Sequence, residues 1–406
     1  MHVLVSPGRF DRPTTSAPGA PGPAGWPAMS APEVARAIAD GWHDTRPDDR
    51  VDLLPLGDGG PGLIDVLRPV RGGELVAATV PDAGGVPVPG AVLVLTEDSG
   101  ARTAWVDGSL ALAGSAPVAG SSTAGLGELV RAALATEAER IVVGTGPRRV
   151  TAHDGGWGLL RALLGGDGLP ESPPVQAPPG FAERLAGLIA ELRGRDLVLL
   201  GHHDLPLLGL NGASAALVDA GRAGAEESQA VERRMADLVA MLTAAAGPGR
   251  RDLLATGHGH DHGILPAATA TRPGVTPGSG AGGGAAFALG LLGARRVDGA
   301  AWVADAVRLA DRVAEVDLVV TGAGVLDATA LEEGVLPAVS AAALPLGIPL
   351  IALAAELRTG RRDWGAAGVV GAFGVIESPE QLAGWQAGPA TALRARIPRV
   401  ARTWSR

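Results

Sequence analysis

The chain has 406 residues, of which 46% are hydrophobic and 19% are charged, and its formal net charge is −9 at pH 7. This length predicts two domains, and the acidic balance disfavours a nucleic-acid partner, which would need a concentrated basic surface. The chain has no cysteine and all 34 basic residues are arginine, which excludes thiol nucleophiles, cysteine metal ligands, and Schiff-base or phosphate-loop lysines.

The first ten residues, MHVLVSPGRF, lack the basic segment and the long apolar run of a secretory signal. We also find no apolar run in the sequence that is long enough to span a bilayer. We therefore expect a soluble, cytoplasmic protein without a membrane partner.

The two ends of the chain share one pattern of alternating strands and helices. Residues 2–7 and 51–56 predict strands, and residues 30–42 predict an amphipathic helix that begins after Ser30. The C-terminal third predicts a strand, a helix and two more strands, at residues 316–324, 335–347, 348–357 and 366–375. Strands that alternate with helices favour a parallel, doubly wound sheet.

The middle of the chain has a different character. Strand-forming runs at residues 74–80 and 89–98 come first, and further strands then alternate with helices as far as a long helix at residues 227–245. We therefore predict an α/β protein in which residues 1–68 and 277–406 form one doubly wound domain. A second α/β domain, residues 69–276, is inserted into it.

Five clusters of glycine and polar residues follow strand candidates or open a helix. They contain Asp58, Asp154, Asp204, the run from Ser279 to Gly284, and Asp327. Any one of them is ordinary turn chemistry, but glycines beside a carboxylate at a strand end can also bring backbone N–H groups and an acid to a phosphate.

In their order along the chain these clusters resemble the motifs of the type I glycerate kinase family. LPLGDGGPGLIDVL resembles the family's P-L-A-D-G-G-E-G-T, and SSTAGLGELVRAAL resembles T-S-Y-G-T-G-E-L-I. HDGGWG is similar to N-D-G-G-A-G, LGHHDLPLLG to C-D-V-D-N-P-L-x-G, and GSGAGGG to G-A-G-A-A-G-G. VDLVVTGAGVLDATALEEGVLP stands where the family has D-L-V-I-T-G-E-G-x-x-D-x-Q-T-x-x-G-K-x-P.

The resemblance implies a flavodoxin-like domain with an inserted domain, and phosphorylation of D-glycerate with ATP and Mg²⁺. It assigns the chemistry to Asp58 and Asp327, which would orient the metal or the glycerate hydroxyl. It assigns substrate or nucleotide binding to ten further residues: Gly59, Gly60, Asp154, Gly155, Gly156, Asp204, Ser279, Gly280, Gly322 and Gly324.

Several positions depart from the family pattern. In the first motif, P-D-S-F-K-G, Gly8 replaces the acid and Asp11 replaces the lysine. Leu205 replaces the asparagine of N-P-L, Ala323 replaces the glutamate of T-G-E-G, and the last motif lacks both its glutamine and its lysine. Phosphoryl transfer depends on positioned positive charge, so these losses predict a reduced or lost kinase activity.

The phosphate-cradling segment G-G-S-A-T has become GPRRVT, in which a proline and two arginines stand where small residues would let the backbone approach an anion. Four arginines are candidate replacement cations: Arg9, Arg12, Arg148 and Arg149.

The same residues allow other interpretations. Asp58 and Asp327 could be turn or helix-cap aspartates, the glycines after Ser279 could form only a hinge, and Asn211 is expected to cap a helix. The chain could be a catalytically depleted paralogue that binds a small carboxylate or a nucleotide. The run GHGHDHG holds His258, His260 and His262 and weakly resembles a metal-dependent hydrolase motif, but its composition favours a polar surface loop.

Overall fold

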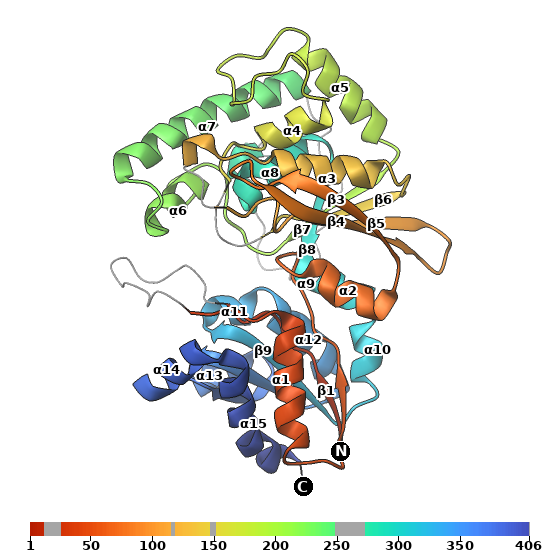
Figure 1. Ribbon diagram of the computed structural model, residues 1–406, viewed down its shortest axis with the longest axis vertical. Coiled ribbons are helices and arrows are strands. Elements are labelled where there is room, and N and C mark those ends of the chain that lie inside the picture. The colour runs from red at the N-terminus through yellow and green to blue at the C-terminus, as the bar shows by residue number, and fades with distance from the viewer. Residues whose placement is uncertain (12–25, 115–117, 147–151, 248–272, 406) are drawn as a thin grey trace, which may run out of the picture.

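The computed structural model describes residues 1–11, 26–114, 118–146, 152–247 and 273–405. The chain forms two sheets stacked along the long axis of the molecule, with both termini at the end of the first sheet (Figure 1). No helix in these ranges is both long and apolar enough to cross a membrane.

The first sheet is built from both ends of the chain. Its order is β11-β10-β9-β1-β2, and every neighbouring pair is parallel. The strands are β1 (His2–Val5), β2 (Arg50–Leu53), β9 (Leu318–Leu326), β10 (Leu350–Leu357) and β11 (Val369–Gly374). The prediction that the two chain ends share one parallel sheet is confirmed.

The second sheet is mixed, in the order β3-β4-β5-β6-β7-β8. The first three strands pair antiparallel and the remaining pairs are parallel. The strands are β3 (Glu74–Pro81), β4 (Pro87–Thr96), β5 (Arg102–Asp107), β6 (Arg140–Gly144), β7 (Asp196–Gly201) and β8 (Arg295–Asp298).

The position of β8 corrects the expected division at residue 277. That boundary assigns β8 to the doubly wound domain, but β8 pairs with β7 in the inserted sheet, from Val198 opposite Arg295 to Gly201 opposite Asp298. The four residues of β8 are mostly exposed and include two arginines, so no apolar run marks this edge strand in the sequence.

Helices cover both sheets. They are α1 (Ala31–His43), α2 (Leu63–Arg71), α3 (Ala124–Leu134), α4 (Trp157–Leu163), α5 (Phe181–Leu192), α6 (Ala213–Asp219), α7 (Ala225–Ala246), α8 (Ala285–Leu291), α9 (Gly299–Ala306), α10 (Leu309–Val313), α11 (Ala328–Glu332), α12 (Val335–Ala343), α13 (Arg361–Ala366), α14 (Pro379–Ala387) and α15 (Pro389–Trp404). Short 3₁₀ turns are η1 (Val118–Gly120), η2 (Pro273–Val275), η3 (Ala281–Gly284) and η4 (Leu344–Leu346).

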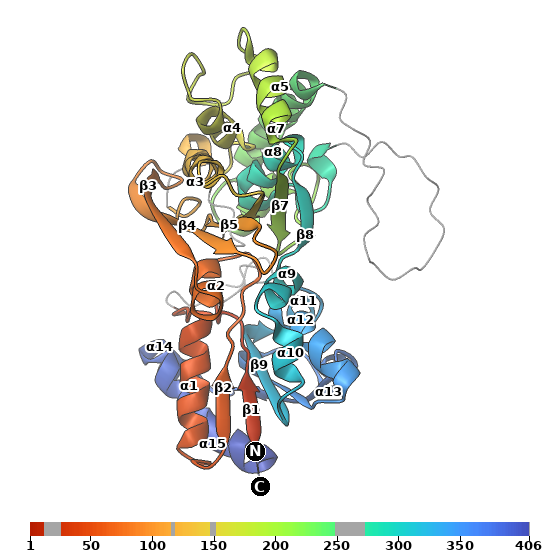
Figure 2. The same cartoon turned by 90° about the vertical axis from the view of Figure 1, so that its right-hand side faces the viewer.

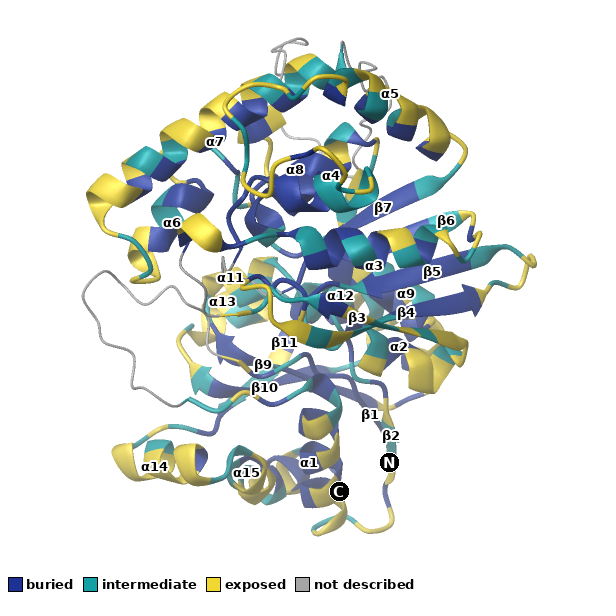
Figure 3. Ribbon diagram, turned by 45° about the horizontal axis from the view of Figure 1, so that its top comes forward, coloured by how far each residue is buried: buried dark blue, intermediate teal, exposed yellow. Residues whose placement is uncertain are grey.

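The buried residues, dark blue in Figure 3, include three apolar clusters that form the core. One lies between the first sheet and helices α1 and α15, and another lies between the second sheet and helices including α3, α4, α7 and α8. The middle cluster contains side chains of both sheets, such as Val319 of β9 and Val198 of β7, together with Leu63 and Leu67 of α2. The two domains therefore share part of one core.

Helix α1 shows why the sequence pattern was informative. The Ser30 N–H donates to Glu33 Oε2 at 2.8 Å while the Glu33 N–H donates to Ser30 Oγ at 3.4 Å, which is a capping box. Val34, Ile38 and Trp42, spaced four residues apart, are fully buried against the first sheet.

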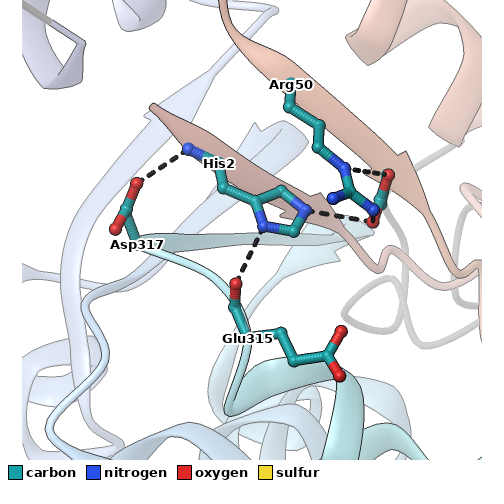
Figure 4. A network of polar contacts seen from close by, with 5 residues as sticks. His2, Arg50, Glu315 and Asp317 are labelled. Atoms are coloured by element: carbon teal, nitrogen blue, oxygen red, sulfur yellow. Dashed lines mark hydrogen bonds and ion pairs between the residues drawn. The ribbon is translucent and has the colours of Figure 1, made fainter.

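At the amino end of the first sheet, His2 of β1 contacts β2 and the segment that precedes β9 (Figure 4). Its backbone N–H donates to Asp317 Oδ2 at 2.7 Å, and its ring nitrogens lie 2.8 Å from Glu315 O and 3.0 Å from Asp52 Oδ2. These contacts tie β1 to β2 and to the start of β9. These contacts therefore lie at the amino ends of the strands, on the side of the sheet away from the second domain.

The glycine run after Ser279 packs backbone against backbone rather than forming an open hinge. Gly283 has φ +68°, and a Cβ atom there would overlap the carbonyl oxygen of Ala152. Gly284 likewise contacts the backbone of Gly155.

We predict that Gly283→Ala lowers the free energy of unfolding by roughly 3 kcal/mol, because the methyl group requires both a left-handed conformation and a backbone shift. The matched control is Gly187→Ala in the exposed interior of α5, where nothing lies within 4 Å. The free energy of unfolding of that control should rise by up to about 1 kcal/mol, because alanine has a higher helix propensity than glycine. Urea titrations of the three proteins measure both effects, and an unchanged midpoint for Gly283→Ala would contradict the packing.

Candidate active site

The carboxyl ends of the parallel strands in the two sheets face each other (Figure 2). β1 runs up from the N-terminus toward the second sheet, and β8 runs down to α9 at the junction. In open α/β sheets, ligands bind beyond the carboxyl ends of the strands. The junction is therefore the candidate active site.

The loop that carries Asp58 crosses this junction. It follows β2 of the first sheet and lies against the ends of strands in the second: a Cβ atom at Gly144 would come within 2.5 Å of Gly59 O, and one at Gly299 would overlap Asp58 O. Asp58 Oδ1 accepts a hydrogen bond from Gly60 N at 3.0 Å, which is an Asx turn. Turn geometry therefore fixes the carboxylate at the end of this loop.

Asp327 lies at the same edge of the first sheet, directly after β9. Its Oδ1 accepts from Ala330 N at 3.0 Å and caps α11, so the helix-cap interpretation of this residue is confirmed. The glycines before it serve close packing: Gly322 O accepts from Gly8 N at 3.0 Å, and Gly324 lies against the backbone of Asp11. Both acids that the resemblance assigns to the chemistry thus follow strands of one parallel sheet.

Asp154 is different, because its carboxylate is buried and fully engaged. It is 3% exposed and accepts hydrogen bonds from Thr123 N and Oγ1, Gly156 N and Gly158 N at 2.9–3.0 Å, with Ser122 Oγ at 3.3 Å. Burial raises the pKa of Asp154, and the hydrogen bonds oppose that shift. The residue ties the start of α3 to the start of α4.

A second engaged carboxylate, Asp107 at the end of β5, was missed in the sequence. It accepts from Gly62 N at 3.1 Å and Leu63 N at 3.0 Å, so it caps the start of α2 from another strand. Ser109 donates to it through both N and Oγ. Desolvation raises the pKa of Asp107. Its only signal in the sequence is its place directly after the buried run TAWV.

Asp204 lies on the surface after β7. Its side chain is 67% exposed and accepts from Arg296 Nη2 of β8 at 2.7 Å, and the same nitrogen donates to His203 O. An ion pair this exposed contributes little to stability. That Asp58, Asp154, Asp204 and Asp327 line one cleft stays a prediction.

The glycine run proposed for nucleotide binding uses its polar groups internally. Ser279 Oγ donates to Gly274 O and accepts from Leu207 N, and Gly280 N donates to Leu205 O at 3.0 Å. Gly155 N donates to Gly283 O. These N–H groups therefore stabilise the fold of the inserted domain.

Some predicted residues lie outside the described ranges. These are Arg12, Arg148, Arg149, His258, His260 and His262. Within the described ranges, no three acidic, histidine or cysteine side chains are grouped to hold a metal ion. Asn211 was expected to cap α6, but the N-cap of that helix is Gly212, and the helix start has no side-chain cap.

The comparison with protein families decides the assignment. The model of the Glycerate kinase family matches residues 27–405. The chain belongs to this family. It is 32% identical to the uncharacterized protein Mb2228c of Mycobacterium bovis over 381 residues, which cover 92% of this chain and 87% of that protein. It is 28% identical to a glycerate kinase of Bacillus subtilis, over 88% of this chain and 85% of that one.

A crystal structure from Salmonella typhimurium LT2, assigned as glycerate kinase 2, has the same fold as this family member. It superposes with a TM-score of 0.66 and 22% identity, covering 99% of this chain and 98% of the other. The match confirms the predicted fold class, a parallel sheet with a second α/β unit inserted in the chain.

His153, which precedes Asp154, titrates in an unusual range. Burial, helped by the nearby charge of Arg234, lowers the pKa of His153 from 6.5 to about 4. The unfolded chain therefore takes up this proton first as the pH falls. The stability that neutral His153 contributes is complete above about pH 6.5 and is lost as the pH falls toward 4.

We predict that the wild-type protein loses about 2–3 kcal/mol more unfolding free energy between pH 7 and about pH 4.5 than His153→Asn does. Urea titrations at both pH values measure the difference, in which the other titrating groups cancel. Equal losses in the two proteins would show that His153 is not buried in its neutral form.

Proposed function

We propose that this protein phosphorylates D-glycerate with ATP and Mg²⁺ in the cytoplasm, and that its turnover is far slower than that of family members with complete motifs. One observation carries the proposal: Asp58 and Asp327 follow strands of one parallel sheet at the edge that faces the inserted domain. Family membership over residues 27–405 supports it.

The two carboxylates suit a nucleotide-dependent reaction. In phosphotransfer sites Mg²⁺ is commonly held by one or two carboxylates together with the substrate phosphates, so a cage of three protein ligands is not required. Bound Mg²⁺ would neutralise phosphate charge. Asp58 or Asp327 would then orient the glycerate hydroxyl and accept its proton, while the other carboxylate holds the metal.

Reduced turnover follows from charged groups that are missing, both lysines and acids, and from helix-start N–H donors that are already in use. Gly8 and Ala323 supply no charge at positions where the family motifs have acids, and the motif lysines are absent. Arg9 is a candidate replacement cation, but its Nε lies 3.4 Å from Asp11 Oδ2. Asp11 therefore neutralises part of the charge of Arg9. The starts of α2 and α4 donate to Asp107 and Asp154.

Because the N–H groups at the starts of α2 and α4 already donate to Asp107 and Asp154, a second candidate function is also supported. It is a catalytically depleted paralogue that binds a small carboxylate or a nucleotide without turnover. It differs from the first proposal only in the chemical step. Measurements of turnover and of binding on one preparation therefore separate the two.

We predict that purified protein releases ADP from ATP and D-glycerate at least about a hundred-fold more slowly than the Bacillus subtilis glycerate kinase, because each lost charge-assisted contact can cost a hundred- to a thousand-fold. Asp58→Asn and Asp327→Asn should abolish the remaining rate. Asparagine preserves both the Asx turn and the helix cap, so these variants test the charge and not the fold.

Asp65→Asn is the matched control, because Asp65 is exposed on the first turn of α2. It should leave the rate unchanged. A rate typical of the family would contradict the depletion argument. Failure of both ATP and D-glycerate to bind in calorimetric titration would contradict the proposed site itself.

A further inference from the structure

A pocket that is partly open to solvent lies on the six-stranded domain, between η1, the segment at residues 172–175, α7 and the loop before α4. Its volume is about 200 Å³. Its lining includes Val118, Ser121, His153, Val231, Arg234 and Asp237.

His153 lines this pocket and has one ring nitrogen without a hydrogen-bond partner among the described residues. The residue is 4% exposed, its N–H donates to Ser121 Oγ at 2.9 Å, and its ring Nε2 lies 3.1 Å from Ser214 Oγ. Within the described part of the chain, its Nδ1 has no hydrogen-bond partner. A buried polar atom left unpaired is costly, so a ligand that pairs with Nδ1 would gain this interaction on binding.

Arg234 is the cationic side chain in the lining. It is an exposed residue of α7, and it makes no ion pair with any residue that the structure describes. A guanidinium suits a carboxylate or phosphate oxyanion. Two carboxylates, Asp154 and Asp237, also line the pocket. The two carboxylates would repel a doubly charged phosphate more than a singly charged carboxylate. The pocket therefore favours an anion with one negative charge.

The volume of the pocket and its apolar lining limit the size and chemical class of the ligand. A cavity of about 150 Å³ can hold benzene, so about 200 Å³ suits an acid of roughly six to eight heavy atoms and not a nucleotide. Val118, Val231 and Met235 give the pocket an apolar wall, which suits a short carbon chain.

We propose that this pocket binds a small monocarboxylate, with its carboxylate on Arg234 and a neighbouring hydroxyl or keto oxygen hydrogen-bonded to His153 Nδ1. The inference does not rest on the kinase proposal. Ser121, His153 and Asp154 of the lining belong to segments that resemble family motifs, but Arg234 and residues 172–175 do not. Binding here needs neither ATP nor metal.

Calorimetric titration of the full chain with sodium D-glycerate, without nucleotide, tests the proposal. We expect binding that Arg234→Ala weakens at least ten-fold. Arg233→Ala should leave it unchanged, because Arg233 is equally exposed on α7 but does not line the pocket. Absence of binding, or equal affinity in the wild-type and Arg234→Ala proteins, would overturn the proposal.

Two further measurements identify the contact and the ligand class. The ring-nitrogen resonances of His153, assigned by their loss in His153→Asn, should shift when D-glycerate is added, and no shift would contradict the assigned hydrogen bond. Inorganic phosphate should bind more weakly than D-glycerate. Tighter, Arg234-dependent binding of phosphate would overturn the carboxylate assignment.

These outcomes are independent of turnover. If the protein shows no kinase activity but binds D-glycerate through Arg234, the kinase proposal fails and this inference stands. If the protein turns over D-glycerate while Arg234→Ala leaves calorimetric affinity unchanged, this inference fails and the kinase proposal stands.

Discussion

Close contact between backbones at a few glycines holds the junction of this protein together. Gly144 and Gly299 let the loop at Asp58, which comes from the first sheet, lie directly on the strand ends of the second. No side chain larger than hydrogen fits at either position without moving the loop. The middle apolar cluster, to which both sheets contribute, depends on the same approach.

This close packing leaves the polar backbone groups of the loops to be satisfied from within the chain. Asp107 accepts from the start of α2, and Asp154 accepts from the start of α4. A helix start attracts anions, and here the anions are the chain's own carboxylates. The glycine motifs that resemble phosphate-binding loops therefore serve the architecture first, while Asp58 and Asp327 occupy the sheet edge where ligands bind in this class of fold.

Much of the fold could be predicted because local pattern and tertiary structure agree. The strands of the five-stranded sheet are apolar in the sequence because they are buried in the structure. The pattern of Ser30 and Glu33 predicts a helix start because the two residues form a capping box there. The short, charged strand β8 could not be predicted, because it is specified by pairing with β7 and not by its own residues.

The site was only partly predictable, for a related reason. Motif resemblance predicted Asp58 and Asp327 as site residues, and the structure places both at one sheet edge. It could not show that both oxygens of Asp154 accept hydrogen bonds inside the fold. The contacts of Asp107 and His153 were not predicted, because they are made with residues distant in sequence. His153, for example, meets Ser214 of α6 and lies near Arg234 of α7.

Amide hydrogen exchange at Gly62, Leu63, Gly156 and Gly158, with and without ATP and Mg²⁺, tests most directly whether carboxylates occupy these helix starts. If Asp107 and Asp154 hold these donors, all four amides exchange slowly in the free protein, and nucleotide slows them no further. Fast exchange in the free protein, followed by strong protection when nucleotide is added, would show that the loops are open phosphate sites and would contradict this account.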